Sequence, residues 1–392
     1  MSKSLPCWSL SLPDVICFSH LRWDSVVQRP HHLMTRWARE RRVFWIEEPC
    51  DGASAPTLEM RPSGVEDLHV VVPRVPDDLH GAAADQAIAC AVAALAREEE
   101  IESHIRWYYT PRLLPYATQL PTPVATVYDC MDELTAFAGA DPSLGHFEGC
   151  LFRAADVVFT GGRSLYEAKR SRHPRVHAFP SSVDIEHFRR ARTWREEPAD
   201  QRDIPRPRLG YFGVLDERLD LDLIRAVADL RPHWQLVFIG PTAKIDPRTL
   251  PCRPNVRYLG PRSYRDLPAY LAGWDVALLP FARNAATKHI SPTKTPEYLA
   301  GGAPVVSTSI RDVVDPYGRR GLVRIADTAT DFVAACEAAM AEARRARLAR
   351  VDRFLAGRSW DRTWREMRAI VDDVAAPPRP LVASVDEAWL TT

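Results

Sequence analysis

The residues with the clearest chemical use lie in one segment of the second half of the chain, SPTKTPEYLAGGAPVVST at 291–308. Thr295 is a good N-cap and Pro296 a good first helical residue, so we expect a helix to begin here and to stop at Gly301–Gly302. The first turn of a helix presents free N–H groups and the positive end of the helix dipole. This start is therefore a candidate binding site for a phosphate group.

Two charged residues flank the predicted helix start. Lys294 would add a full positive charge beside a phosphate, and Glu297 could accept hydrogen bonds from two vicinal ribose hydroxyls. The structural alternative is that Glu297 only stabilises the first turn, as acidic residues do in any helix, and that Lys294 is solvated. Gly302 and Pro304 lead directly into a predicted buried strand. This places the helix start at the carboxyl edge of a sheet, where open α/β sheets bind ligands.

A second segment, RLGYFGVLDERLDLDLI at 208–224, supplies further candidates for the same site. Gly213 follows a predicted strand and leaves room for close approach of a ligand to the backbone. Arg218 could reach a diphosphate across a crevice. The alternative is that Arg218 only pairs with its acidic neighbours Asp216 and Glu217, an arrangement that is common and weak at surfaces.

In the first half of the chain, polar residues follow two predicted strands. The loop SHLRWDSVVQRPHHL at 19–33 is long for a turn, and Arg29 and His31 near its end could contact an anion and a hydroxyl group. Asp129 and Asp132 follow another strand and could edge the same cleft, although aspartates also stabilise turns. The histidines in the loop have no carboxylate or cysteine at a metal-ligand spacing, so we predict no metal site.

Short apolar runs alternate with longer helix-period segments, and the alternation occurs twice along the chain. This pattern is typical of two parallel sheets crossed by helices. The predicted strands of the first half are 14–19, 43–47, 68–72, 106–109, 125–128, 157–160 and 176–179. Those of the second half are 208–212, 235–239, 256–259, 276–279, 305–307 and 322–325. We expect a long helix over about 328–350 and another from Ser359.

A charged, proline-bearing stretch without apolar period separates the two alternations and predicts a linker. The chain length of 392 residues suits two domains, which would face one another across a cleft. We predict an N-terminal Rossmann-like acceptor domain (1–185), a linker (186–206), a C-terminal Rossmann-like domain (207–357), a terminal helix packing back on the first domain (358–375) and a tail (376–392).

Composition excludes several classes of protein. Lysine plus arginine equals aspartate plus glutamate at 51 each, so no net field favours nucleic acid. The eight cysteines include no Cys-x-x-Cys pair, which indicates reduced thiols. No run approaches the ~20 apolar residues of a membrane-spanning helix, and Lys3 followed by Pro6 does not form a signal peptide. We therefore predict a cytoplasmic protein.

The combination of Glu297, Ala300, Gly302, Pro304 and the following Val-Val resembles the nucleotide-sugar motif of family-4 glycosyltransferases, which have the GT-B fold of two Rossmann-like domains. The residues NVRYLGPRSYRDLPAYLAGWDVALLPF (255–281) and ADVVFTGGRSLYEAKRSRHPRVHAFPSSVDIEHF (155–188) are also similar to the family, so the resemblance spans roughly 14–370. It implies that Glu297 binds the donor ribose. His289 stands where the family commonly has a second Glu that contacts the donor sugar.

The resemblance implies a metal-independent hexosyltransferase of polysaccharide biosynthesis. Such an enzyme moves a sugar from a nucleotide-diphosphate donor to a glycan, lipid-linked or small-molecule acceptor, and it needs no cofactor besides the donor. As catalytic residues we predict Arg218, Lys294, Asp132 and His20. For the donor we predict Gly213, His289, Ser291, Thr293, Thr295 and Glu297. For the acceptor side we predict Asp24, Arg29, His31 and Asp129.

The stereochemistry and two rival functions remain open at this point. We favour retention, as in family 4, because the departing phosphate then takes the acceptor proton; an inverting enzyme would need a buried carboxylate as general base. A nucleotide-sugar epimerase of the same fold is one rival. A non-catalytic nucleotide-sugar-binding partner is the other, favoured by His289 and by the lack of the lysine that accompanies Arg218 in the family.

Two basic stretches of the first half, Arg36–Arg42 and Arg163–Arg175, suggest contact with anionic lipid at the inner membrane face. The alternative, which we favour two to one, is that these are solvated helix faces.

Overall fold

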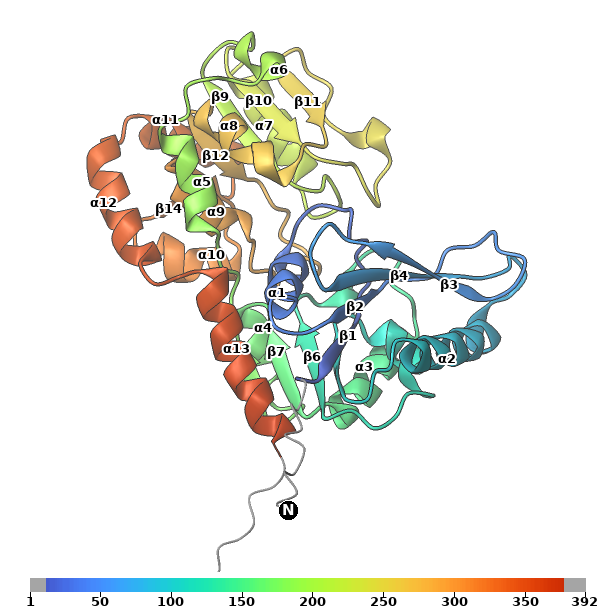
Figure 1. Ribbon diagram of the computed structural model, residues 1–392. Helices are drawn as coiled ribbons and strands as arrows, with labels where there is room; N and C mark the ends of the chain where they lie inside the picture. The colour runs from blue at the N-terminus through green and yellow to red at the C-terminus, as the bar shows by residue number, and fades with distance from the viewer. Residues whose placement is uncertain (1–11, 377–392) are drawn as a thin grey trace, which may run out of the picture.

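The computed structural model describes residues 12–376, which form two α/β domains, each built on one sheet (Figure 1). The first sheet has the order β3-β4-β2-β1-β5-β6-β7-β8 and is parallel except for β3. Its strands are β1 (Asp14–Phe18), β2 (Val43–Ile46), β3 (Thr57–Pro62), β4 (Leu68–Arg74), β5 (His104–Tyr108), β6 (Ala125–Cys130), β7 (Val157–Thr160) and β8 (Val176–Ala178).

Helices cover both faces of the first sheet, which is why β1, β2, β6 and β7 are buried at every position. Alternate residues of β1 divide between two cores: Val15 and Cys17 face one, Ile16 and Phe18 the other. The first core is closed by α1 (Arg29–Trp37) and by α13 (Trp360–Ala375). The second is closed by α2 (Gly81–Glu98), α3 (Leu144–Ala154), α4 (Arg163–Lys169) and the 3₁₀ helix η1 (Pro111–Ala117).

The second sheet is wholly parallel, with the order β11-β10-β9-β12-β13-β14. Its strands are β9 (Arg208–Phe212), β10 (Gln235–Ile239), β11 (Val256–Gly260), β12 (Val276–Leu279), β13 (Val305–Ser307) and β14 (Val323–Ile325). Its helices are α7 (Leu221–Leu230), α8 (Leu267–Ala272), α9 (Lys294–Gly301), α10 (Arg311–Val313), α11 (Ala329–Met340) and α12 (Arg344–Leu355). The predicted fold class of two doubly wound parallel sheets is confirmed.

The predicted linker over 186–206 is wrong as a description of this stretch, because it is folded onto the second domain. It contains α5 (Ile185–Arg189), η3 (Arg190–Arg192) and α6 (Ala199–Arg202). Phe188 and Ala191 are buried in the core of the second domain, and Gln201 is buried between Trp274 and the Tyr270 carbonyl. These few apolar contacts are too widely spaced to give a helical period in the sequence.

Three other predictions differ from the structure. The antiparallel edge strand β3 was not predicted, since its residues are all exposed or half-buried and give no alternation of apolar and polar positions. The long helix over 328–350 is two helices, α11 and α12, that are separated at residues 341–343. The terminal helix α13 does pack on the first domain, with Trp360 and Met367 fully buried against it. Of the predicted tail (376–392), residues 377–392 lie outside the described residues.

The two domains contact one another below the cleft. The Asp312 carboxylate, from the second domain, accepts a 3.0 Å hydrogen bond from the Ser164 amide at the first turn of α4. Gly162 permits this approach, because a Cβ there would lie 2.1 Å from the Asp312 carboxylate. The Ser181 hydroxyl donates to the Ser291 carbonyl at 2.5 Å, and Arg311 pairs with Glu167. These contacts fix how the two sheet edges face each other.

The basic stretches singled out for lipid contact are largely engaged in ion pairs. Arg36 and Arg39 bind Asp361 of α13, and Arg42 binds Asp14. In the second stretch Lys169 binds Glu133 and Glu148. Most of the charge in these stretches therefore holds the first domain together. Among residues 12–376, no helix is long and apolar enough to cross a bilayer.

Candidate active site

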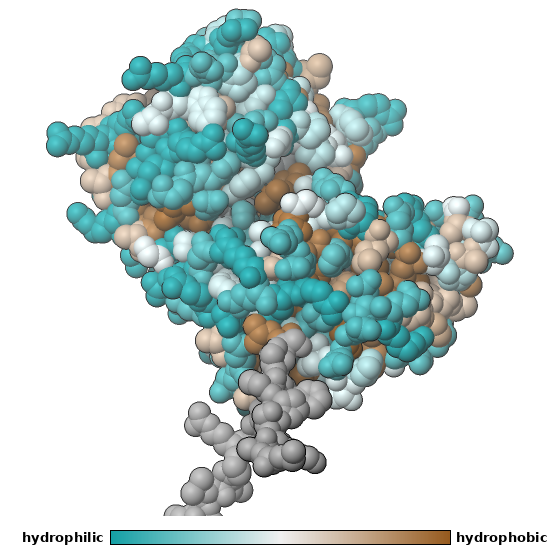
Figure 2. All heavy atoms as spheres, viewed as in Figure 1, coloured by the Kyte–Doolittle hydropathy of each residue, from teal (hydrophilic) through white to brown (hydrophobic). Residues whose placement is uncertain are grey.

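A furrow separates the two lobes, and apolar surface lies along it among hydrophilic residues (Figure 2). A pocket opens into the furrow at the carboxyl edge of the second sheet, where the loops after β9, β10 and β11 meet the start of α9. The first domain closes it with Val26, Val27 and Gln28 from the loop before α1. The site is therefore built by both domains, at the sheet edge that the sequence predicts.

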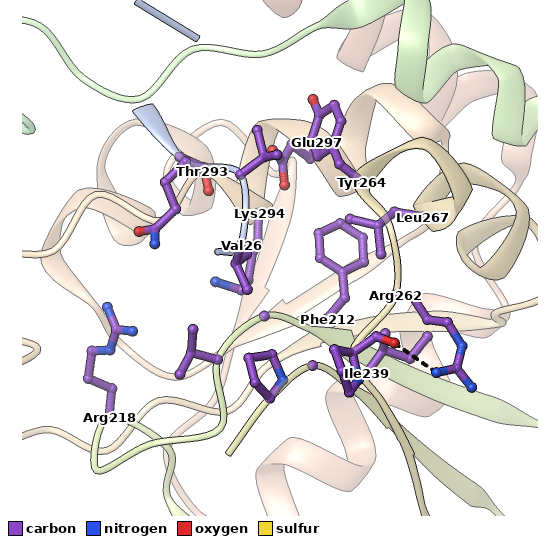
Figure 3. A pocket seen from close by; sticks show the side chains of 17 residues that line it. Val26, Phe212, Arg218, Ile239, Arg262, Tyr264, Leu267, Thr293, Lys294 and Glu297 are labelled. Carbon is purple, nitrogen blue, oxygen red and sulfur yellow. Dashed lines mark hydrogen bonds between the residues drawn. The ribbon is translucent and has the colours of Figure 1, made fainter. Parts of the chain in front are cut away.

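Lys294 lies at the centre of this pocket (Figure 3). Its side chain crosses the Gly213 backbone so closely that a Cβ on Gly213 would lie 2.1 Å from the Lys294 Cε atom. Gly213 also has φ +137°, which disfavours other residues. Among the described residues no carboxylate lies within 4.0 Å of the Lys294 ammonium group, which is 5.4 Å from the centre of the Tyr211 ring. The ammonium group is thus available to a ligand.

Glu297 faces the same pocket from the first turn of α9 and is only 4% exposed. Burial raises the pKa of Glu297, with Lys294 opposing the rise. Burial and the charge of Arg218 lower the pKa of Lys294 from its usual 10.5. Burial therefore disfavours the charged form of both groups. A ligand whose hydroxyl groups donate to Glu297 and whose negative charge lies beside Lys294 would offset this cost of desolvation.

The helix start differs slightly from the prediction. α9 begins at Lys294 with Thr293 as the N-cap residue, so Thr295 is inside the first turn rather than at the cap. Thr295 is completely buried and its hydroxyl has no hydrogen-bond partner among the described residues, so the structure does not bring it into the pocket. Thr293 lines the pocket. The helix ends at Gly302 with φ +86°, as the glycine pair predicts.

Arg218 stands at the other end of the pocket (Figure 3). Its Nε and Nη2 atoms donate to the Asp216 carboxylate at 3.0 and 2.6 Å. The predicted alternative of pairing with an acidic neighbour is therefore correct, yet it does not consume the guanidinium group. Among the described residues Nη1 has no acceptor. Although burial opposes it, the Asp216 hydrogen bond and charge raise the pKa of Arg218, so the group remains a cation.

Asp132 lies between the domains, in a second small pocket that it shares with Arg218, Lys294 and Ser291. Burial raises the pKa of Asp132, which Arg218 and Lys294 oppose. Ser291 also lines this pocket, while its backbone carbonyl holds the Ser181 hydroxyl at the domain contact. A carboxylate and two cations from different elements thus converge at the centre of the furrow.

The predicted acceptor residues are mostly engaged in the first domain's own structure. Arg29 and Asp129 form a fully buried ion pair at 2.9 Å, and Arg29 also donates to the Phe179 carbonyl. His31 accepts from the Gln28 amide and contacts the Trp23 carbonyl, which makes it part of the cap of α1. Asp24 is 69% exposed and pairs with Arg61. The structure does not bring His31, Asp129 or Asp24 into the furrow, because each serves local structure.

His20 lines a large cavity of about 760 Å³ at the carboxyl edge of the first sheet. Burial, together with the charge of Lys244, lowers the pKa of His20 from 6.5 to about 4. Its Nδ1 atom is buried without a partner among the described residues. His289 lies apart from this cavity and from the Lys294 pocket, near Glu133 and Arg311 at the domain contact. The contact of His289 with the donor sugar stays a prediction.

The sequence analysis missed the apolar wall of the Lys294 pocket and the charged residues of the large cavity, which are Glu48, Asp51, Arg112, Asp141 and Lys244. Phe212, Ile239, Leu267 and Tyr264 line the first. Lys244 reaches the second from the loop after β10. Position after a strand is the signal that could have identified Lys244, since loops at the carboxyl edge of a parallel sheet meet at the ligand crevice. Within residues 12–376 there is no group of three His, Cys, Asp or Glu side chains suited to a metal ion.

Comparison with known proteins relates part of the chain to a family. Residues 206–342, which hold the whole Lys294 side of the pocket, match the family described as glycosyl transferases group 1. The chain is 26% identical over 285 residues to the Bacillus subtilis (strain 168) putative teichuronic acid biosynthesis glycosyltransferase TuaH. This match covers 67% of the chain and 66% of the relative, so the chain aligns with just under two thirds of that protein's length.

Solved structures share the fold at low identity. Sucrose-phosphate synthase from Thermosynechococcus elongatus superposes with a TM-score of 0.68 at 13% identity, over 93% of this chain and 99% of that one. The E. coli trehalose-6-phosphate protein bound with UDP-2-fluoro glucose superposes with a TM-score of 0.66 at 12% identity, over the same shares. Residues 206–342 thus match the group 1 glycosyltransferases, and the two facing parallel-sheet domains have the GT-B fold that these solved structures share.

Proposed function

We propose that this protein transfers a sugar from a nucleoside-diphosphate sugar to an acceptor bound by the first domain. The observation that carries the proposal is the pocket in which Lys294, Arg218 and the first turn of α9 present positive charge and N–H groups beside Glu297. The diphosphate would lie between the two cations, and Glu297 would accept hydrogen bonds from the ribose hydroxyls. The base would lie against Phe212 and Leu267.

Chemistry in this site would consist mainly of stabilising the leaving group. As the bond from the anomeric carbon to the phosphate oxygen breaks, negative charge grows on the diphosphate, where Lys294 and the free Nη1 of Arg218 are already in place. Because these cations supply the positive charge, we propose that no metal ion is required. The acceptor oxygen then bonds to the anomeric carbon.

We propose that transfer retains the anomeric configuration. The acceptor hydroxyl proton then passes to the departing phosphate oxygen, and no protein base is needed. Asp132 shares a small pocket with both cations, and it is the carboxylate that would act as the general base if the reaction inverted instead. Nuclear magnetic resonance of the product distinguishes retention from inversion. An α-linked donor should give an α-linked product with both the wild type and Asp132→Asn. A β-linked product from the wild type, formed by a reaction that Asp132→Asn abolishes, would contradict retention.

The first experiment is a thermal-shift screen of nucleoside diphosphates and their sugars, because a ligand that binds only the folded state raises the melting temperature. A ligand that shifts it is then assayed for transfer with and without a chelator. We expect a shift with at least one nucleoside diphosphate and undiminished turnover under chelation. No shift with any of them would overturn the donor site, and complete loss of turnover under chelation would overturn metal independence. Isomerised donor without acceptor would instead identify an epimerase.

A further inference from the structure

The second sheet divides at its centre, where the strand order reverses between β9 and β12. These neighbours pair only as far as Gly210 and Ala277, after which β9 continues along β10 and β12 continues along β13. The Gly213 amide donates to the Ile239 carbonyl of β10 at 2.8 Å. Successive amides of a strand point to opposite sides, so the Phe212 amide faces the gap on the β12 side. Ligands of open α/β sheets bind beside this division.

Tyr298, in the middle of α9, fills this gap. Its hydroxyl oxygen accepts a buried hydrogen bond of 2.9 Å from the Phe212 amide. The Tyr298 side chain is 0% exposed, and its ring meets the Phe212 ring edge to face, with 4.7 Å between the ring centres. A buried amide without a partner destabilises a fold, so the Tyr298 hydroxyl replaces the acceptor that a neighbouring strand would otherwise supply.

Lys294 lies one turn before Tyr298 on the same helix. Residues four apart share one face of a helix, so both side chains reach the end of β9. Lys294 crosses the backbone at Gly213, while Tyr298 holds the residue before it. On the β10 side, the Gly213 carbonyl lies so close to Gly240 that a Cβ on Gly240 would be 1.9 Å from it. The Gly213 backbone is thus fixed by β10 on one side and by α9 on the other.

We propose that Tyr298 is a positioning residue for the donor. Its hydroxyl sets the separation between Lys294 and the backbone at Gly213, so that the diphosphate contacts both at once. The inference rests on the proposed function, since Lys294 and Gly213 line the pocket assigned to the diphosphate. Tyr298 is not among the described residues that line this pocket, and it acts on the ligand only through Phe212 and Gly213. Loss of the hydroxyl therefore affects the phosphate groups more than the rest of the nucleotide.

The test is Tyr298→Phe, which removes the hydroxyl and keeps the ring in the core. Calorimetry measures Kd for the nucleoside diphosphate from the thermal screen and for the corresponding nucleoside monophosphate. We expect the variant to bind the diphosphate about tenfold more weakly and the monophosphate less than about threefold more weakly. Tyr128→Phe is the matched control, because it removes a buried hydroxyl that donates to Glu148 at 3.1 Å in the first domain. This control should leave both Kd values unchanged.

Amide hydrogen exchange checks the contact itself in the ligand-free protein. The Phe212 amide should exchange at least about tenfold faster in Tyr298→Phe than in the wild type, and at the wild-type rate in Tyr128→Phe. Unchanged exchange at Phe212, or an equal change of affinity for the two nucleotides, overturns the positioning role and leaves the donor site intact. If the wild type binds no nucleoside diphosphate, the donor site is overturned, and this inference with it.

Discussion

Each domain contains an arginine at the furrow that is held by an aspartate, Arg29 in the first domain and Arg218 in the second. The two differ in whether the guanidinium group keeps a nitrogen free for a ligand. Arg29 has all three nitrogens occupied, by Asp129, the Phe179 carbonyl and the Met367 sulfur atom. Arg218 is held just as firmly by Asp216 through Nε and Nη2, but its Nη1 atom remains unoccupied among the described residues. An ion pair therefore does not by itself make an arginine structural; what decides is whether a donor is left over and where it points.

The largest effect should come from breaking the buried pair of the first domain. Arg29→Met leaves the Asp129 carboxylate uncompensated in a position that is 0% exposed. We expect the free energy of unfolding to fall by about 3–5 kcal/mol, as measured by denaturant titration. The double variant Arg29→Met/Asp129→Asn is the matched control and should recover most of that loss. A single variant with wild-type stability would show that the pair does not hold the domain.

On the donor side, Lys294→Met should reverse this pattern of effects. The ammonium group is desolvated and no carboxylate of the described residues lies within 4.0 Å, so removing it should change the free energy of unfolding by less than about 1 kcal/mol. Loss of a cation facing the leaving diphosphate should lower kcat by about 100- to 1,000-fold. Lys288→Met is the control for a general loss of charge. Wild-type kcat in Lys294→Met would contradict the diphosphate assignment.

Glu297→Ala should produce a smaller change, limited to donor affinity. Two hydrogen bonds to ribose hydroxyls are worth about 10- to 100-fold in Kd, measured by calorimetry. A donor that lacks both ribose hydroxyls tests the contact directly. Wild-type protein should bind this donor more weakly than the normal donor, whereas Glu297→Ala should bind the two donors equally well. If removal of the hydroxyls weakens binding by the same factor in both proteins, Glu297 only stabilises the start of α9.

The smallest effect should be a shift of pH dependence. Burial lowers the pKa of Lys294 from 10.5, so the positive charge is lost at a lower pH than for an ordinary lysine. Affinity for the nucleoside diphosphate should therefore decline with rising pH, by up to about tenfold between about pH 7.5 and 10. Lys294→Arg keeps its charge throughout this range and should flatten the decline. An identical decline in both proteins would assign it to another group.

The fold was predictable because both sheets are buried on both faces, and their strands are short apolar runs that alternate with helices. The Lys294 side of the site was predictable for a related reason: Lys294, Glu297 and Gly213 are placed by the backbone at strand and helix ends, which leave a mark in the sequence. The acceptor side was not. Whether Asp129 faces a ligand or a buried arginine depends on Arg29, 100 residues away.

The same limit explains why Lys244 was missed. It lines the large cavity of the first domain only because the domains are apposed, and no local pattern contains that information. His289 was predicted from its spacing to Glu297, and it lies on the irregular loop before α9, near Glu133 and Arg311.

The helix α13 has a consequence for how the protein must be made. Its residues Trp360, Met367 and Val371 are completely buried in the first domain, where Trp364 meets Trp37 at 6.0 Å between ring centres. Domains generally fold as they emerge during synthesis. Here the core of the first domain is incomplete until α13 has been translated, which happens only after the whole second domain. Until then, the tryptophans that pack against α13 are exposed to solvent. A nascent chain stalled before residue 360 should therefore need a chaperone more than the finished protein does.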